Sequence, residues 1–290
     1  VSKAIKVLQD GNIFEVRAIG TAKKDILSGY FRDADTLLKA FDTIDMRSRN
    51  VYITLGQIKE DCFARAQSEQ FLKAPQTTSD TDIAAYRWLF VDLDPIRTVG
   101  ISSSDEELQL AYGLAEKVMA YLKNMGFAEP VRAMSGNGIH LLYRISLPNT
   151  KENVGIIERC LKVLADMVST DKVKIDTTNS NPSRICKLHG TMAQKGRSPQ
   201  KRPHRMSRIL SVPDEIQQTQ EEILRRLAAE LPDDEPKADR RPAGRGVQQQ
   251  TFDLLKFMKE HGLTIHSERS NDRAEIYELE EGPFDPSHKE

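Results

Sequence analysis

The chain has 290 residues, 39% hydrophobic and 29% charged, which is typical of a folded protein with one large core or two modest ones. No apolar run approaches the roughly 18 residues that cross a bilayer, and no basic stretch followed by an apolar one begins the chain, so we expect a cytoplasmic protein without a membrane span. The net charge of -1 argues against a general polyanion binder, and three scattered cysteines are too few for a disulfide framework or a metal knuckle.

The segment 1–80 predicts an α/β unit. Alternating apolar residues over 12–19 indicate a strand, and an acidic cap followed by helical apolar spacing indicates a helix over 33–44. A second strand is expected at 50–55, and 57–72 has helical character.

The segment 81–213 predicts a sheet with two helices on one face. Its elements follow the order strand, helix, strand, strand, helix, strand over 87–176, which is typical of a ferredoxin-like or RNA-recognition-motif (RRM-like) sheet. The strands are expected at 87–94, 130–134, 139–145 and 173–176, and the helices at 104–125 and 150–168. We therefore predict an α+β fold with a small C-terminal α/β appendage.

The remaining chain is polar. A helix is predicted over 214–231, and 232–246 carries charge, proline and glycine without periodicity, so we expect a linker there. The segment 247–290 is expected to form a small unit with a short helix and two strands.

Two aspartates end the apolar strand "RWLFVDLDP". Since strand side chains alternate between faces, Asp92 and Asp94 project from one face with Cα atoms ~6.6 Å apart, given a rise of ~3.3 Å per residue. Two-metal phosphoryl transfer needs such fixed anionic oxygens. The alternative is a solvent-facing strand end before Pro95.

Asp176 adds a third carboxylate to this pattern. It ends the predicted strand 173–176, which a ferredoxin-like order places antiparallel to the Asp92 strand, so all three acids could meet on one sheet. The alternative is a side-chain cap for the following turn.

Two further segments offer phosphate ligands. "MSGNGIHLLY" offers three kinds of potential donor to a phosphate: the backbone N–H groups of a tight glycine turn, the hydroxyl of Ser135 and the imidazole of His140. The alternative is an ordinary hairpin with an incidental histidine. In "NPSRICKLHGT", Arg184 and Lys187 are cationic and His189 can donate, although strand alternation would place the two cations on opposite faces unless the chain turns.

A basic loop follows over 195–208, without acidic residues. It can bind a nucleic-acid backbone by counterion release, and a solvated flexible loop is the alternative. Its cationic residues are Lys195, Arg197, Lys201, Arg202, Arg205 and Arg208.

Together these motifs resemble the archaeo-eukaryotic primase superfamily, specifically the primase-polymerases of phages and plasmids. "FVDLDP", "SGNGIHLLY" and "KIDTTNSNPSRICKLHGT" occur in the family order, and the resemblance spans roughly 12–213. It implies a catalytic domain over 1–213 in which Asp92, Asp94 and Asp176 hold two Mg²⁺ or Mn²⁺ ions.

The same resemblance implies a template-dependent primase or DNA polymerase acting on DNA template and primer with nucleoside triphosphates. The residues that would contact the nucleotide are Ser135, Gly136, His140, Arg184, Lys187 and His189. The C-terminal "EEGPFDPSHKE" looks like the start of a Cys-Pro-Phe…His segment, but Gly282 stands at the cysteine position, so we expect no zinc here. A longer parent chain with a helicase part is also expected.

Two other functions compete with this one. A haloacid-dehalogenase-type phosphatase also carries an Asp-x-Asp pair after a strand, but it expects Thr or Val where Ile96 stands, and a later Gly-Asp pair is missing from the sequence. A non-catalytic nucleic-acid-binding module would usually stack bases on exposed sheet aromatics, whereas aromatic residues make up only 6% of this chain.

Overall fold

The structure is a computed structural model in which the chain divides into two compact units, Val1–Asp233 and Asp234–Glu290. It describes residues 1–9, 11–22, 25–65, 69–73, 76–232, 255, 258–259, 261–271 and 274–279. Within these ranges, no helix is both long and apolar enough to span a membrane.

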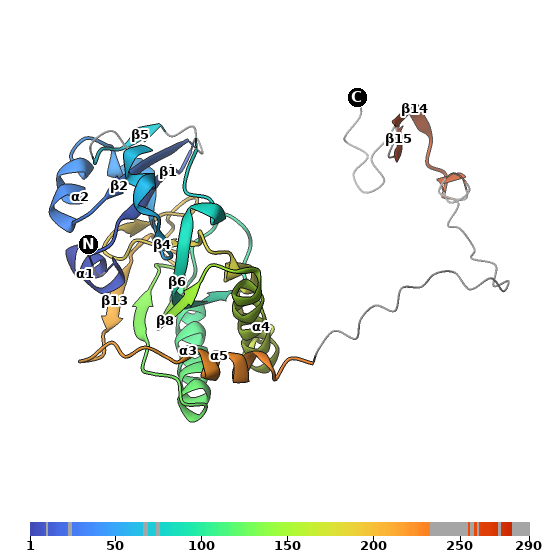
Figure 1. The fold of residues 1–290 in the computed structure, drawn as a ribbon. Coiled ribbons are helices and arrows are strands. Elements are labelled where there is room, and N and C mark those ends of the chain that lie inside the picture. The colour runs from blue at the N-terminus through green and yellow to red at the C-terminus, as the bar shows by residue number, and fades with distance from the viewer. Residues whose placement is uncertain are drawn as a thin grey trace. The chain divides into compact units, whose positions relative to one another are not determined.

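The first sheet has five antiparallel strands in the order β10-β3-β1-β2-β5. Figure 1 labels its strands β1, β2 and β5. This sheet and its flanking helices comprise α1 (Ser2–Gln9), β1 (Phe14–Gly20), β2 (Ile26–Phe31), α2 (Ala34–Phe41), β3 (Arg49–Thr54), β5 (Leu72–Lys73) and β10 (Ile185–Lys187). Because β10 pairs with β3, a strand from the third sequence motif completes the sheet of the N-terminal segment.

The second sheet has the order β13-β7-β8-β6-β4, and β9 also pairs with β6. Its elements are β4 (Gln57–Ile58), β6 (Ile83–Pro95), α3 (Asp105–Asn124), β7 (Val131–Met134), β8 (Ile139–Pro148), α4 (Lys151–Val168), β9 (Val173–Ile175) and β13 (Arg208–Ser211). The antiparallel series β9-β6-β8-β7 is the predicted ferredoxin-like order. The prediction of a mixed α+β fold with antiparallel sheets is therefore confirmed.

The two faces of β6 belong to different cores. Leu89, Val91 and Leu93 are fully buried in the cluster that α3 and α4 form with the second sheet, whereas Trp88 and Phe90 pack with the first sheet. Because side chains alternate along a strand, Asp92 and Asp94 project from the same face of β6 as Trp88 and Phe90, toward the first sheet. The sequence therefore directs both carboxylates into the space between the sheets.

The helix α3 begins with the predicted capping box. The hydroxyl of Ser104 accepts from the Glu107 N–H at 3.2 Å, and the Glu107 carboxylate accepts from the Ser104 N–H at 2.9 Å. Two orphan donors of the first turn are thereby satisfied. The helix ends before Gly126, whose φ of 90° is a backbone conformation that favours glycine.

The helix predicted over 57–72 is wrong. This stretch contains β4, a 3-10 helix over Glu60–Arg65 and β5, with residues 66–68 outside the described ranges. The competing interactions are long-range: Ile58 pairs with Ile83 of β6, and both pack with Cys62 in a small separate cluster. The helix α1 and the strand β2 were not predicted.

The helix predicted over 214–231 is shorter in the structure, where α5 spans Glu221–Ala228. Ile216 packs against the core of the first sheet, whereas Leu224 and Leu227 are buried against α3 and α4. The segment 216–227 therefore passes from the core of the first sheet to that of the second, and its residues before α5 are not helical.

The second unit contains an antiparallel hairpin of β14 (Ile265–Asn271) and β15 (Ala274–Leu279). These are the two strands that were predicted within 247–290. Nearly all of the predicted linker 232–246, most of the predicted helix and the segment 280–290 lie outside the described residues.

Candidate active site

The structure brings the three predicted carboxylates to one cavity of about 310 Å³. Asp92 and Asp94 come from β6, and Asp176 directly follows β9, where its N–H donates to the Asp92 carbonyl at 3.0 Å. The pairing of Leu93 with Ile175 fixes this arrangement. Three acids from two neighbouring strands thus share one wall.

The shared wall makes the negative charge of Asp92 unfavourable. Burial, followed by the charges of Asp94 and Asp176, raises the pKa of Asp92 to about 8, while Lys195 and Arg97 act in the opposite direction. A bound cation would relieve this repulsion, since it stabilises the charged form.

Two of the three carboxylates nevertheless have partners within the protein. Asp94 Oδ2 lies 3.3 Å from Arg97 Nη1, and Asp176 Oδ1 accepts from the N–H and the hydroxyl of Thr178 at 2.9 and 2.7 Å. The capping role considered for Asp176 is therefore real. Among the described residues, no group of three or more His, Cys, Asp or Glu side chains could hold a metal ion as they stand.

The donor set still fits a hard divalent cation. Carboxylate oxygens are the ligands that Mg²⁺ and Mn²⁺ prefer. The raised pKa of Asp92 shows a charge that the protein itself leaves poorly compensated. All three carboxylates line the same cavity.

The turn between β7 and β8 differs from the expected anion cradle. The N–H groups of Asn137 and Gly138 donate to the hydroxyl of Ser135, at 3.3 and 2.9 Å, so they are directed at the turn itself. Ser135 lines the cavity, whereas Gly136 has a φ of 103° and packs so closely on Ala193 that a Cβ would overlap it. Gly136 is thus a packing position and not part of the cavity lining.

The two histidines form a buried pair. His140 lines the cavity with Nε2 3.5 Å from Asp92 Oδ1, and its Nδ1 lies 3.2 Å from Nε2 of His189. Burial, and then the neighbouring His189, lower the pKa of His140 well below its usual value, so the ring is neutral. His189 lies behind His140 and is not part of the cavity lining, so the structure does not place it at a bound triphosphate.

Arg184 and Lys187 both line the cavity, despite the alternation of β10. Arg184 precedes the strand and donates to the Thr178 carbonyl, while Lys187 Nζ donates to the Met192 carbonyl at 2.7 Å. Because Arg184 lies outside the strand, its direction is independent of the pleat. The site therefore carries acids and cations around one space.

Lys187 should make the binding of a phosphate ligand in this cavity dependent on pH. Burial lowers the pKa of Lys187 to about 7. Because an anionic phosphate is attracted by the charged ammonium, we expect the dissociation constant of a nucleoside triphosphate to rise by roughly tenfold for each pH unit above 7. Lys187→Arg, which stays charged, should flatten the profile. A binding titration at several pH values measures this, and an equally steep profile in the arginine variant would contradict it.

The basic loop is fastened to the start of α3 at two positions. Arg202 makes a bidentate pair with Glu107 at 2.6 and 2.7 Å, and Arg205 pairs with Asp105 at 2.6 Å. The short strands β11 (Met192–Ala193) and β12 (Arg205–Met206) close its base. The other predicted cations of the loop are exposed: Lys195, Arg197, Lys201 and Arg208.

Several residues that line the cavity were not predicted, because they come from segments far from the three sequence motifs or from turns within them. Asn50 and Tyr52 line the cavity from β3, and Asn50 exchanges two hydrogen bonds with the backbone of Gln194, at 2.7 and 2.8 Å. Asn137 and Asn179 line it as well. The alternation of "NVYITL" places Asn50 and Tyr52 on one face, but which face meets the cavity depends on distant strands: Asn50 pairs with Ile19 of β1, and Tyr52 with Lys187 of β10.

No protein-family model and no curated protein matches the chain. Among solved structures, it is similar to primase RepB′, with a TM-score of 0.45 and 10% identity over 79% of this chain and 60% of that one. It is also similar to the catalytic domain of primase RepB′ in complex with initiator DNA (0.43, 11%, covering 79% and 93%). A third is the polymerase domain of Mycobacterium tuberculosis Ligase D in complex with DNA (0.41, 15%, covering 78% and 85%). The similarity at these identities is one of fold.

Proposed function

We propose that this protein is a template-dependent nucleotidyltransferase, a primase or DNA polymerase that uses two Mg²⁺ or Mn²⁺ ions. The observation that supports this most is that one cavity of about 310 Å³ is lined by three acids, Asp92, Asp94 and Asp176, together with the cations Arg184 and Lys187. A nucleoside triphosphate with its divalent ions presents the complementary pattern, because the ions meet the acids and the phosphates meet the cations.

Asp92, Asp94 and Asp176 would hold the ions. When bound, the ions would lower the pKa of an attacking hydroxyl and neutralise the leaving pyrophosphate. The protein's own contribution is to fix the three carboxylates on adjacent strands, with Asp92 in a position where its charge lacks compensation.

The cationic residues would bind the triphosphate. Lys187 is positioned by the Met192 carbonyl and Arg184 by the Thr178 carbonyl, so both are ordered before the nucleotide arrives. Such preorganised charge stabilises phosphoryl transfer without a nucleophilic side chain. The exposed cations of the basic loop would bind the template through its phosphates, without reading bases.

His140 would hold a proton between the carboxylates and the core. If Nε2 carries that proton and faces Asp92, then Nδ1 accepts from Nε2–H of His189, which matches the 3.2 Å separation. His189 thus sets the tautomer of His140, a role that differs from the triphosphate contact expected from the sequence.

A single incorporation assay tests the proposal. Labelled deoxy- or ribonucleotides are supplied with template alone or with primed template, in Mn²⁺, in Mg²⁺ and in excess chelator. We expect template-directed incorporation that chelation abolishes. Release of inorganic phosphate from small phosphoesters without a template would instead favour a phosphatase, and DNA binding without incorporation would favour a binding module.

A further inference from the structure

The loop between β9 and β10 connects an acid to a cation at the smaller of two adjoining cavities, the one of about 310 Å³. It begins after Asp176 and ends at Arg184, and Asn179 within it also lines this cavity. Its first half is a 3-10 helix over Thr177–Ser180, with Asp176 as its cap. The position of Arg184 at the cavity therefore depends on how this loop is held.

An aspartate from a distant segment binds the second half of the loop. Oδ1 of Asp80 accepts from the N–H and the hydroxyl of Ser183, at 2.9 and 2.7 Å, and from Nδ2 of Asn181 at 3.3 Å. Burial acts to raise the pKa of Asp80, but the hydrogen bonds from Ser183 and Asn181 and the charge of Arg184 outweigh it and lower this pKa. Asp80 is thus a charged acceptor for the residues just before Arg184, and it lines neither cavity.

Asp80 is itself held in place. Its carbonyl accepts from Nδ2 of Asn149 at 2.7 Å, and Asn149 directly follows β8. The 3-10 turn that Asp80 begins is closed by Asp82, whose Oδ2 accepts from the N–H of Ser79 at 2.9 Å. The loop is therefore attached, through Asp80, to the second sheet.

The direction of the Arg184 side chain is set by the loop itself. The backbone N–H of Arg184 donates to the Asn181 carbonyl at 3.1 Å, and its carbonyl accepts from the N–H of Leu55 at 3.0 Å. Its guanidinium donates to the Thr178 carbonyl of the same loop, and its Nε is buried without a partner among the described residues. A change in the shape of the loop would therefore change the direction of the guanidinium.

We propose that Asp80 is a positioning residue for the incoming nucleotide, because it holds the loop in the shape that directs Arg184 at the triphosphate. This inference rests on the proposed function, in which Arg184 binds that triphosphate in the smaller cavity. Without the carboxylate, the turn before Arg184 would open to water and the guanidinium would adopt several directions. The affinity for the nucleotide would then fall, because the order that precedes binding is lost.

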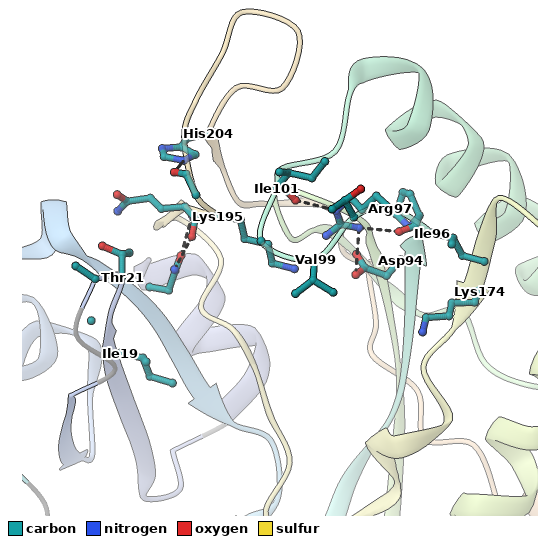
Figure 2. A pocket seen from close by; sticks show the side chains of 18 residues that line it. Ile19, Thr21, Asp94, Ile96, Arg97, Val99, Ile101, Lys174, Lys195 and His204 are labelled. Atoms are coloured by element: carbon teal, nitrogen blue, oxygen red, sulfur yellow. Dashed lines mark hydrogen bonds and ion pairs between the residues drawn. The ribbon is translucent and has the colours of Figure 1, made fainter. Parts of the chain in front are cut away.

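The larger cavity, of about 740 Å³, separates this effect from others (Figure 2). It shares Asp94 with the smaller cavity, and Lys174 also lines it, as Figure 2 shows. None of the described residues 177–184 lines it. An effect of Asp80 that passes through Arg184 should therefore be confined to the ligand of the smaller cavity.

Steady-state incorporation by Asp80→Ala and Asp80→Asn tests the assignment. We expect Asp80→Ala to raise the KM for the incoming nucleotide roughly tenfold, while kcat and the KM for primed template stay within about twofold of wild type. Asparagine keeps an acceptor oxygen for Ser183 and Asn181, so Asp80→Asn should stay within about twofold of wild type in all three constants. An unchanged nucleotide KM in Asp80→Ala, or an equal rise in Asp80→Asn, would overturn the inference.

Asp33→Ala is the matched control. Asp33 is an exposed aspartate that also accepts from the N–H and the hydroxyl of one residue, Thr36, at 2.8 and 2.9 Å, and it lines neither cavity. It should lose stability without a change in the nucleotide KM, and a rise as large as in Asp80→Ala would contradict the assignment. Ser183→Ala removes only one of the three bonds to Asp80 and should raise the nucleotide KM about threefold.

A double-mutant cycle with Arg184→Ala gives a readout that a loss of stability alone would not produce. The dissociation constant of a nucleoside triphosphate is measured with Mn²⁺ by binding titration. Asp80→Ala should raise it roughly tenfold in the wild-type background and less than about twofold in the Arg184→Ala background. Wild-type protein that incorporates no nucleotide would refute the proposed function and this inference together. Active wild type with additive losses in the cycle would refute the inference alone.

Discussion

Replacing Asp92 by asparagine should lower nucleotide incorporation by about 1,000-fold, the order expected when a preorganised electrostatic group is removed. Asparagine keeps the shape of the side chain and removes its charge, so the loss would report on cation binding rather than on packing. Asp94→Asn should have a similar effect. The measurement is single-turnover primer extension with saturating Mn²⁺ and labelled nucleotide.

The same variant should be at least as stable as wild type. Because burial and the neighbouring acids raise the pKa of Asp92 to about 8, the folded state holds this proton more tightly than the unfolded chain does. The raised pKa of Asp92 therefore adds to the free energy of unfolding in full below about pH 4, and this addition is lost as the pH rises to about 8. The Asp92 side chain keeps 24% of its surface exposed, which moderates the effect.

Urea unfolding at pH 5 and pH 8, without divalent ions, measures this. The drop in unfolding free energy between the two pH values should be smaller in Asp92→Asn than in wild type. Asp214→Asn, at an exposed position, serves as the control for removing one acid. Full incorporation by Asp92→Asn, or a drop as large as in wild type, would contradict this account of the site.

Gly138→Ala should reduce both stability and activity. A Cβ at Gly138 would overlap the carbonyl oxygen of Leu93 and lie 2.9 Å from Asp94 Oδ1, so the turn and β6 would have to separate. Overpacking of this kind costs about 1–3 kcal/mol. Because the displaced strand carries Asp92 and Asp94, incorporation should fall about 100-fold, the order that a misplacement of about 1 Å costs.

Gly155→Ala is the matched control for that change. Gly155 lies within α4, and a Cβ there would meet no heavy atom of the described residues within 4 Å, apart from its own helix and chain neighbours. Alanine should stabilise the helix by about 0.5–1 kcal/mol without changing incorporation. Denaturant unfolding and primer extension on both variants make the comparison. Wild-type incorporation by Gly138→Ala would show that the close approach of the turn is not needed.

The central elements were predictable because their signals are local. The capping box of α3, the apolar spacing of α4 and the "SGNG" turn each specify one structure within a few residues. The strand β2 was missed, and its Gly29 packs so closely on the Gln70 carbonyl that a side chain would not fit. The close packing requires glycine at this position, and glycine has a low strand propensity. The residue that the fold needs therefore weakens the strand pattern in the sequence.

The residues of the site also fall into two groups, those with a local sequence signal and those placed by contacts between distant segments. Strand alternation placed Asp92 and Asp94 on one face, and the order of elements placed Asp176 beside them. Contacts across the chain carry no local signal: Asn50 bonds to Gln194, 144 residues away, and Arg202 pairs with Glu107, 95 residues away. The sequence did not indicate that a single hydroxyl, that of Ser135, would accept hydrogen bonds from two of the turn amides.

Anomalous diffraction from crystals soaked with Mn²⁺ and a non-hydrolysable nucleoside triphosphate tests the central claim most directly. We expect two manganese peaks ~3.5–4 Å apart, bridged by oxygens of Asp92, Asp94 and Asp176, with the triphosphate on Arg184 and Lys187. Manganese bound elsewhere, or triphosphate bound without manganese at these carboxylates, would contradict the account.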